Sequence, residues 1–474
     1  MEVAIFMPVN SFENYPMAWK PDKSMLKTPI YISLAELLEQ DILDGRLAPN
    51  TLLPPQRELA DFLDVNLSTI TRAFKLCEMK SLIHATIGKG TFVSPNAVFK
   101  NSGMQNSEDY IELGPVHPYY QFNSVVTDMA RTILQSFCSE RLFEFGGTAE
   151  YRQHKQIARK WLSEFQIDVS DEDIILTSGT QNALVVSLLS LFKAGDKIAA
   201  DTFTYSNFIN LAKQLNIQLI PINSDCQGVL PDELEKQCRL LDIKGIYLMP
   251  SCANPTGNTM PLERRKAVGD IISRQNIILL EDDTYGFIAD DRICPMAALI
   301  PEHTIYLHGL SKSLSPGLRI AYLVVPHHLQ QIFLNTSSNI NLKIPLLNAE
   351  IASELIRNGT AREIITKKCI LSEERNRLYS KYFKTNSADS CNFFQWLPLP
   401  SGCNGYNFEI QARKQGVNVL CSDRFAVGNT SGFSAVRVAT CSPSTMSELE
   451  TGLQRIQRLI EDNQVVAHNN EFIV

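Results

Sequence analysis

Residues 304–325 read TIYLHGLSKSLSPGLRIAYLVV, two apolar runs that enclose a loop with a single strong base. The runs TIYLHGL and IAYLVVP have the length and the β-branched content of strands that are buried on both faces. Between them, Lys312 stands among serines, and Arg319 follows seven residues later. Because α/β domains present ligand-binding groups at strand ends, Lys312 is a candidate functional base. The alternative is a solvated surface lysine.

Five more apolar runs precede this stretch, separated by amphipathic helical segments: DIILTS, KIAADTF, IQLIPINS, GIYLMPS and IILLEDD. Strands that alternate with helices indicate a mostly parallel sheet in an α/β domain. From about Leu346 helices dominate, and VRVATCSPS adds one more strand. We predict an α/β body over residues 111–465, with a large part at about 130–345 and a smaller C-terminal α/β part at about 346–465.

The totals fit a protein of two or three domains, because 474 residues exceed one compact core. Hydrophobic residues make up 44% and charged residues 20%, and the net charge is −7. We identify no apolar run long enough to span a membrane and no signal peptide, so we expect a cytoplasmic protein without a membrane partner. The eleven cysteines show no C-x-x-C spacing, which argues against a metal site and a disulfide framework.

The first hundred residues follow a different pattern. Residues 30–45 show helical apolar spacing that ends at Gly45. QRELADFLDV and NLSTITRAFKLCEMKSL predict two short helices, the second capped by Asn66 or Ser68, and IHATIGKGTFVS predicts a hairpin. Together they predict a winged helix-turn-helix over residues 27–94, followed by a polar linker at 95–110. Residues 1–26 carry no pattern that we can interpret.

A winged helix-turn-helix places its second helix in the major groove of DNA and its hairpin tip near phosphate. The candidate DNA contacts are Arg57, Ser68, Thr69, Arg72 and Lys89. Arg57 and Lys89 suit phosphate, whereas Thr69 and Arg72 suit base edges. Residues 1–100 hold 10 Lys and Arg against 11 Asp and Glu, so we expect a local basic face. The alternative is a small helical cap whose polar residues only face water.

The segment LPPQRELADFLDVNLSTITRAF…GKGTFV resembles the GntR-type DNA-binding domain. The resemblance includes the Pro-x-x-Arg-Glu-Leu-Ala start, the Thr-x-x-Arg-Ala spacing and the Gly-x-Gly-Thr-Phe wing. It implies a double-stranded DNA operator as partner. Leu67 and Thr71 stand where this family often carries arginine, so we expect the bases that are read to differ.

Further residues at strand ends suit pyridoxal phosphate, which needs a Schiff-base lysine, an anion site and an acid beside its pyridine nitrogen. In IILLEDDTY, Asp282 would be the acid, and Tyr285 would donate to the phenolic oxygen of the ring. Asn254 in SCANPTG could donate to the same oxygen, and Tyr205 in DTFTYSN could stack on the ring. The alternatives are a solvated strand end for Asp282 and a core position for Tyr205.

The phosphate of this cofactor has a candidate site in LTSGTQNALVV, a strand followed by a glycine turn and a helix start. Backbone N–H groups around Thr180 and Gln181, with the Thr180 hydroxyl, can hold a dianion at the positive end of a helix. Ser311 and Arg319 would complete the site from the lysine loop.

The motifs TSGTQ, NPTG, EDDTY and SKSLSPGLRIAY resemble the fold-type I aminotransferases, over roughly Ile111 to Ile460. The resemblance implies bound pyridoxal phosphate with Lys312 as the catalytic residue that forms the internal aldimine, and a homodimer. It also implies that Arg437 in AVRVATCS binds the α-carboxylate of a substrate or effector. Gly309 stands where relatives usually carry a serine, so we expect a cofactor held about 1 kcal/mol less firmly.

A GntR-type head on an aminotransferase-like body resembles the MocR-type transcription regulators. We therefore predict a DNA-binding regulator that senses an amino acid or related amine through external aldimine formation at Lys312. Such a regulator works as a switch only if the ligand binds one arrangement of the dimer better than the other. Two alternatives stay open: a working aminotransferase that carries a DNA-binding domain, and an inactive scaffold that only dimerises.

Overall fold

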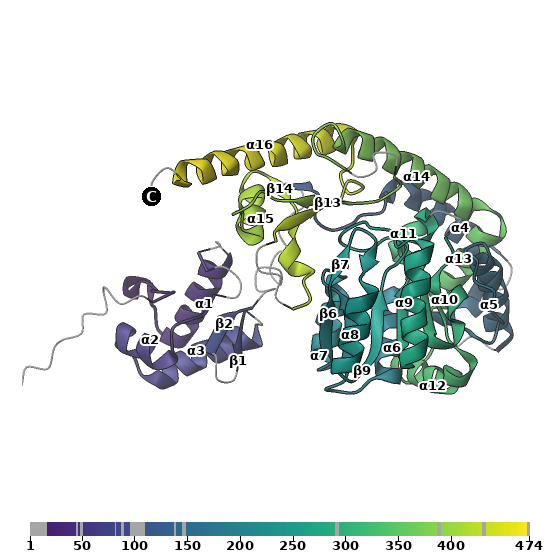
Figure 1. The fold of residues 1–474 in the computed structure, drawn as a ribbon, viewed down its shortest axis with the longest axis horizontal. Helices are drawn as coiled ribbons and strands as arrows, with labels where there is room; N and C mark the ends of the chain where they lie inside the picture. The colour runs from purple at the N-terminus through teal and green to yellow at the C-terminus, as the bar shows by residue number, and fades with distance from the viewer. Residues whose placement is uncertain are drawn as a thin grey trace, which may run out of the picture. The chain divides into compact units, whose positions relative to one another are not determined.

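The computed structural model describes residues 17–43, 46–47, 51–80, 82–86, 90–94, 110–136, 139–144, 148–289, 293–385, 390–428 and 433–471 (Figure 1). The chain forms an N-terminal unit that runs to Asp109 and a second unit that begins at Tyr110. Apart from Tyr110, the linker predicted at 95–110 lies outside the described residues.

The described residues of the N-terminal unit include three α-helices and a hairpin. Its helices are α1 (Ile30–Leu43), α2 (Gln56–Leu63) and α3 (Leu67–Met79), and β1 (Ile83–Thr86) pairs antiparallel with β2 (Gly90–Val93). These elements confirm the winged helix-turn-helix. Asn66 precedes α3 as its cap residue, although its side chain makes no capping hydrogen bond. Gly45 lies outside the described residues.

Trp19 extends the core of this unit upstream of α1. Its side chain is only 4% exposed and packs in the same cluster as the apolar residues of the three helices. Its indole Nε1 donates to Asp41 Oδ2 at 2.8 Å. A single buried tryptophan creates no periodicity, so the sequence pattern did not reveal that Trp19 belongs to this unit.

The second unit is built on a sheet whose described strands run in the order β4-β12-β11-β10-β9-β5-β6. Its strands, all at the predicted runs, are β4 (Ile174–Thr177), β5 (Lys197–Asp201), β6 (Gln218–Ile222), β9 (Ile243–Leu248), β10 (Ile278–Asp282), β11 (Thr304–Gly309) and β12 (Ala321–Val324). Strand β12 is antiparallel to both neighbours, and the other pairs are parallel. The mostly parallel α/β fold is therefore confirmed.

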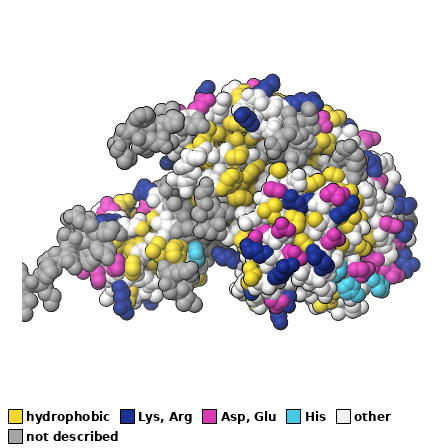
Figure 2. All heavy atoms as spheres, in the orientation of Figure 1, with side chains coloured by type: hydrophobic (Ala, Val, Ile, Leu, Met, Phe, Trp, Pro, Cys, Tyr) yellow, Lys and Arg dark blue, Asp and Glu magenta, His cyan; other side chains and the backbone are white. Residues whose placement is uncertain are grey.

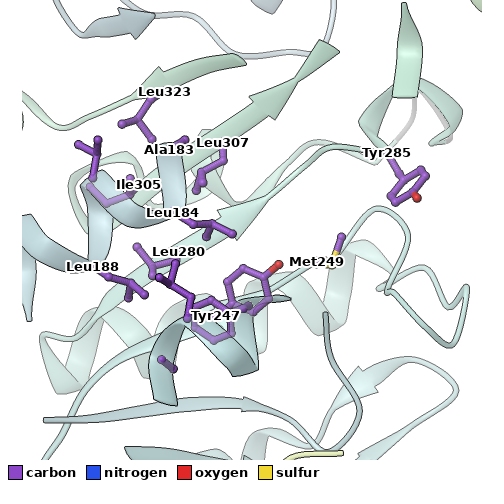
Figure 3. Packing of buried hydrophobic residues seen from close by; sticks show 14 of the residues in the cluster. Ala183, Leu184, Leu188, Tyr247, Met249, Leu280, Tyr285, Ile305, Leu307 and Leu323 are labelled. Carbon is purple, nitrogen blue, oxygen red and sulfur yellow. The ribbon is translucent and has the colours of Figure 1, made fainter. Parts of the chain in front are cut away.

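Both faces of this sheet are covered, because consecutive strand residues such as Ile198 and Ala199 pack in different apolar clusters. On one face lie α6 (Thr180–Leu191), α7 (Ser206–Gln214) and α12 (Gln330–Asn341), and on the other α8 (Pro231–Leu240), α9 (Leu262–Gln275) and α10 (Met296–Leu299). Helices α4 (Asn123–Leu134) and α5 (Thr148–Ser163) pack beside β4 and β12. Figure 3 shows the first of these clusters, where α6 meets residues of β9 to β12.

The C-terminal part begins with α13 (Leu346–Arg357) and α14 (Thr360–Tyr379), as the sequence predicted. Its antiparallel sheet joins β13 (Gln395–Pro398), β16 (Ala435–Val438) and β15 (Leu420–Cys421), and the predicted strand VRVATCSPS overlaps β16. The remaining elements are α15 (Gly405–Lys414), α16 (Met446–Glu471) and β14 (Val417–Asn418), which pairs with β3 (Ile111–Glu112). No helix among the described residues is long and apolar enough to cross a membrane.

Candidate cofactor and effector site

A cavity of about 360 Å³ in the second unit brings the predicted cofactor residues together. Its walls include Thr180, Gln181, Tyr205, Asn254, Asp282, Tyr285, Ser311, Lys312, Arg319 and Arg437. Most of them directly follow strands of the large sheet, and the carboxyl ends of parallel strands meet at one edge. Residues far apart in the sequence therefore share one cavity. Within the described part of the chain no cluster of side chains could hold a metal ion.

Lys312 lies in the short helix α11 (Leu310–Ser313), directly after β11. Its Nζ atom donates to the carbonyl oxygen of Val116 at 2.8 Å. Burial, with smaller contributions from the positive charges of Arg437 and Arg319, lowers the pKa of Lys312 to about 8. A lysine with a lowered pKa offers a neutral, nucleophilic amine near neutral pH.

Another buried lysine forms hydrogen bonds with the backbone of the segment that carries Lys312. Lys368 of α14 donates to the carbonyl oxygen of Lys312 at 3.0 Å and to that of Leu314 at 2.8 Å. Burial lowers the pKa of Lys368 to about 7. Sequence reasoning missed this residue, because an isolated lysine in an amphipathic helix usually faces solvent.

Asp282 ends β10, and both of its carboxylate oxygens are fixed. Oδ1 accepts from the backbone N–H of Thr284 at 3.1 Å and from its hydroxyl at 2.6 Å, and Oδ2 accepts from the Tyr247 hydroxyl at 2.9 Å. Burial raises the pKa of Asp282, and the hydrogen bonds from Thr284 and Tyr247 oppose that rise. A buried carboxylate is stabilised by a cationic partner, and a protonated ring nitrogen would be one.

Tyr247 is a functional candidate that sequence reasoning missed. It lies in GIYLMPS, which was interpreted only as an apolar strand, and its ring stacks on Phe208 with centroids 3.8 Å apart. Figure 3 shows its hydroxyl pointing away from the aliphatic side chains of the cluster. Burial raises the pKa of Tyr247, so its hydroxyl stays protonated and can donate to Asp282.

The start of α6 offers a site for an anion. Gly179 caps this helix with a φ of 86° and without a side-chain capping bond. The Arg319 guanidinium lies so near that a β-carbon on Gly179 would come within 2.8 Å of its Nη2 atom. Gln181 Oε1 is buried and has no hydrogen-bond partner among the described residues. Free helix N–H groups, a cation and an unsatisfied polar atom fit a phosphate-bearing ligand.

The structure also shows what fills the space beside Gly309. A β-carbon on Gly309 would overlap the hydroxyl oxygen of Thr180 and would lie 3.1 Å from Thr284 Oγ1. The two threonine hydroxyls are 3.2 Å apart. The glycine therefore leaves no gap, because Thr180 occupies the space. Because this space is filled, we now expect serine at position 309 to bind the cofactor less firmly than glycine, which is opposite to the expectation from the sequence.

Arg437 comes from β16 of the smaller antiparallel sheet, and its buried side chain lines the cavity. Its Nη1 donates to Asn254 Oδ1 at 2.7 Å, and its Nη2 donates to the carbonyl oxygen of Gly114 at 2.8 Å. The ring of Phe425 lies 4.8 Å from the guanidinium carbon. Burial lowers the pKa of Arg437, a cost that a bound carboxylate would offset.

Two backbone carbonyls complete this site. Gly114 and Val116 follow β3, and their oxygens accept from Arg437 and Lys312 respectively. Nothing in the sequence could have revealed them, because every residue carries the same backbone carbonyl. They therefore occupy one donor of each of the two cations that line the cavity.

The two aromatic candidates differ in their surroundings. Tyr285 is 3% exposed and meets Phe394 edge-on at 5.5 Å, and burial raises its pKa, which keeps its hydroxyl a donor. Tyr205 is half-buried, and its hydroxyl oxygen accepts from Asn207 Nδ2 at 3.0 Å.

In the N-terminal unit, Arg57 of α2 and Ser68 and Arg72 of α3 are exposed, whereas Thr69 is half-buried. The guanidinium of Arg72 lies 5.7 Å from the ring of Tyr31 in α1. Lys89 lies outside the described residues.

The two departures from the GntR pattern have different surroundings in α3. Thr71 donates to Gln56 Oε1 at 2.8 Å, so it joins α3 to α2. Leu67 is 42% exposed at the start of the helix.

Figure 2 shows basic and acidic side chains interspersed on the visible face of the second unit, in line with a mixed charge distribution.

The fold and the site define a DNA-binding protein whose second part is an aminotransferase-type domain. Residues 30–93 match the model of the gntR family of bacterial regulatory proteins, and residues 112–456 match that of class I and II aminotransferases. The HTH-type transcriptional regulator YdeF of Bacillus subtilis is 38% identical over 96% of this chain and 100% of its own length. The chain belongs to the MocR-type transcription regulators, in which a GntR-type domain precedes an aminotransferase domain.

Solved aminotransferases share the fold of the second unit. Kynurenine aminotransferase of Pyrococcus horikoshii, in complex with PMP, has a TM-score of 0.68 and 22% identity, covering 77% of this chain and 96% of its own. The α-aminoadipate aminotransferase LysN of Thermus thermophilus, complexed with N-(5'-phosphopyridoxyl)-L-leucine, has a TM-score of 0.69 and 20% identity. The match covers 77% of this chain and 98% of LysN. At these identities the likeness concerns the fold alone.

Proposed function

We propose that this regulator binds pyridoxal phosphate at Lys312 and senses an amino acid or a related amine. The observation that supports this most is that the amine of Lys312, the fixed carboxylate of Asp282 and the buried guanidinium of Arg437 open on one cavity. Pyridoxal phosphate supplies an aldehyde that condenses reversibly with primary amines. The structural neighbour LysN holds a phosphopyridoxyl group joined to leucine.

The proposed contacts follow from the donors around the cavity. Asp282 would face the ring nitrogen, and Tyr205 would lie on the ring. Asn254 uses its Oδ1 atom for Arg437, so its Nδ2 atom remains to donate, with the Tyr285 hydroxyl, to the phenolic oxygen. The phosphate would be held by Thr180, Gln181, Ser311 and Arg319.

Arg437 would bind the carboxylate of the effector, while the effector's amine takes the place of Lys312 on the cofactor. Arg437 must then exchange the carbonyl oxygen of Gly114 for the carboxylate, whereas Lys312 gives up that of Val116 already when it binds the cofactor. This exchange couples ligand binding to the segment that follows β3. In a homodimer in the cytoplasm, an effector that favours one arrangement would shift operator binding by its differential affinity. Arg57, Ser68, Thr69, Arg72 and Lys89 would contact the double-stranded operator.

The first test is the visible absorbance of the purified protein after loading with pyridoxal phosphate and removal of the unbound cofactor, before and after borohydride. We expect a band that borohydride removes in the wild type, with the cofactor then fixed covalently, and that Lys312→Ala lacks. Amino acids and amines are then titrated against the spectrum and against DNA binding. No band in the wild type would refute the proposal.

A second candidate function is transamination. Lys312, Asp282 and Tyr285, which the resemblance to aminotransferases implies for this reaction, all line the cavity. Release of a 2-oxo acid from an amino acid in repeated turnover would support it. Spectral change without turnover would favour sensing alone.

A further inference from the structure

Helix α14 holds the chain segment that precedes β13. Asn376 Nδ2 donates to the carbonyl oxygens of Ser390 at 2.7 Å and Asn392 at 2.8 Å. Cys391 lies between these two residues, so its position against the helix is set by bonds on both sides. Its Sγ atom donates to Glu373 Oε1 of the same helix at 3.5 Å.

Cys369 lies on the same face of α14, because Cys369, Glu373 and Asn376 are spaced by four and then three residues. The side chain of Cys391 also lies within hydrogen-bonding reach of the Cys369 thiol. Both cysteines are free and partly exposed, so small reagents can reach them. The structure thus places two thiols that are 22 residues apart in sequence beside each other on one face of α14.

The two thiols differ in acidity. The hydrogen bond from Cys391 lowers the pKa of Cys369, and the charge of Lys368 adds to this, while burial opposes it. The contact with Cys369 and burial raise the pKa of Cys391. An acidic thiol beside a less acidic one is the arrangement of an attacking and a resolving cysteine.

We propose that Cys369 and Cys391 form a reversible disulfide within one chain on reaction with a low-molecular-weight disulfide. The Cys369 thiolate attacks one sulfur of the reagent, and the first small thiol leaves. Cys391 then attacks the Cys369 sulfur of the mixed disulfide and releases the second small thiol. The protein dithiol is oxidised by two electrons, the reagent is reduced, and the two cysteine protons end on the two released thiols.

This crosslink would join two elements that each contact a residue lining the cofactor cavity. On the helix, Lys368 precedes Cys369 and donates to the carbonyl oxygen of Lys312. On the other side, the ring of Phe394 lies 5.5 Å from the guanidinium carbon of Arg437, three residues after Cys391. Oxidation would restrict any movement of these elements against each other.

The test maps disulfides in the full-length protein after incubation with glutathione disulfide and alkylation of the remaining thiols. Cys391 and Cys403 share one tryptic peptide, so chymotrypsin is added to cleave between them at Phe393, Phe394 and Trp396. We expect a linked pair of peptides that contain Cys369 and Cys391, lighter by two hydrogens than the reduced pair, which dithiothreitol separates.

Two variants serve as matched controls. Cys226→Ser removes an exposed cysteine outside the pair and should leave the crosslink unchanged, whereas Cys369→Ser should abolish it. Glutathione on Cys369 or Cys391 without a crosslink, a bond to another cysteine, or a covalent dimer would each overturn the proposal. The readout needs neither cofactor nor DNA, so its outcome is independent of the proposed sensing function.

Discussion

The hydroxyl oxygen of Thr180 occupies the space that a β-carbon on Gly309 would need. The same hydroxyl is 3.2 Å from that of Thr284, which donates to Asp282. The hydroxyls of Thr180 and Thr284 therefore connect the proposed phosphate site with Asp282, the proposed ring acid. The absence of a side chain at Gly309 leaves the space that the Thr180 hydroxyl occupies.

Gly309→Ser should weaken pyridoxal phosphate binding, contrary to what the resemblance to fold-type I aminotransferases implies. The added atoms overlap Thr180, and overpacking typically costs about 1–3 kcal/mol, on the order of tenfold or more in affinity. Titration of the cofactor by absorbance measures the change. Adding Thr180→Ala to the serine variant should recover part of the affinity. Tighter binding by Gly309→Ser alone would contradict the steric argument.

Tyr247→Phe should also weaken cofactor binding, because Asp282 Oδ2 loses its donor while the ring stack on Phe208 is kept. A lost hydrogen bond to a buried charged group costs about 1.5–3 kcal/mol, roughly 10- to 100-fold. The dissociation constant from absorbance titration is the measurement. Tyr379→Phe is the matched control, since the Tyr379 hydroxyl is buried without a partner among the described residues. Equal effects of the two variants would refute a role for Tyr247.

The stability of the cofactor-free protein should rise with pH through the titration of Lys312. Its pKa falls from an ordinary 10.5 to about 8 on folding, so the unfolded chain binds more protons between these values. The contribution of Lys312 to the free energy of unfolding is therefore lowest below pH 8 and increases towards pH 10.5. Urea unfolding at several pH values should show a flatter dependence for Lys312→Met than for the wild type. An identical slope would contradict the lowered pKa.

Arg437→Lys should weaken the response to amino acids but not the response to amines that lack a carboxylate. Lysine cannot form the paired hydrogen bonds of a guanidinium, so we expect a loss on the order of 10- to 100-fold for amino acids. Spectral titration with an amino acid and with its decarboxylated amine compares the two. An equal loss for both ligands would show that Arg437 supports the site without binding the carboxylate.

Arg72→Ala should reduce operator binding by about 1–3 kcal/mol and leave the cofactor spectrum unchanged. The operator is first recovered by selection from random-sequence DNA, and binding is followed by fluorescence anisotropy. Arg131→Ala removes an exposed arginine of the second unit and serves as the control. Loss of the cofactor spectrum in the Arg72 variant would contradict the assignment of DNA binding to the first unit and of cofactor binding to the second.

Local signals account for much of what could be predicted. The strands of the large sheet were visible because most of them are short, largely apolar runs, as expected for a parallel sheet that is covered on both faces. Lys312, Asp282 and Thr180 were found because each directly follows such a run in a distinctive motif. A position at a strand end is a property of the local sequence, so it needs no knowledge of the chain's path.

The sequence by itself therefore determined the fold class, the family resemblance and the motif residues. Only the tertiary structure placed the Tyr247 hydroxyl on Asp282, the Val116 carbonyl on Lys312 and the thiol of Cys391 beside that of Cys369. These contacts join residues that are far apart in the chain and carry no local signature. Their geometry depends on how helices and strands pack, and packing is decided by the whole chain.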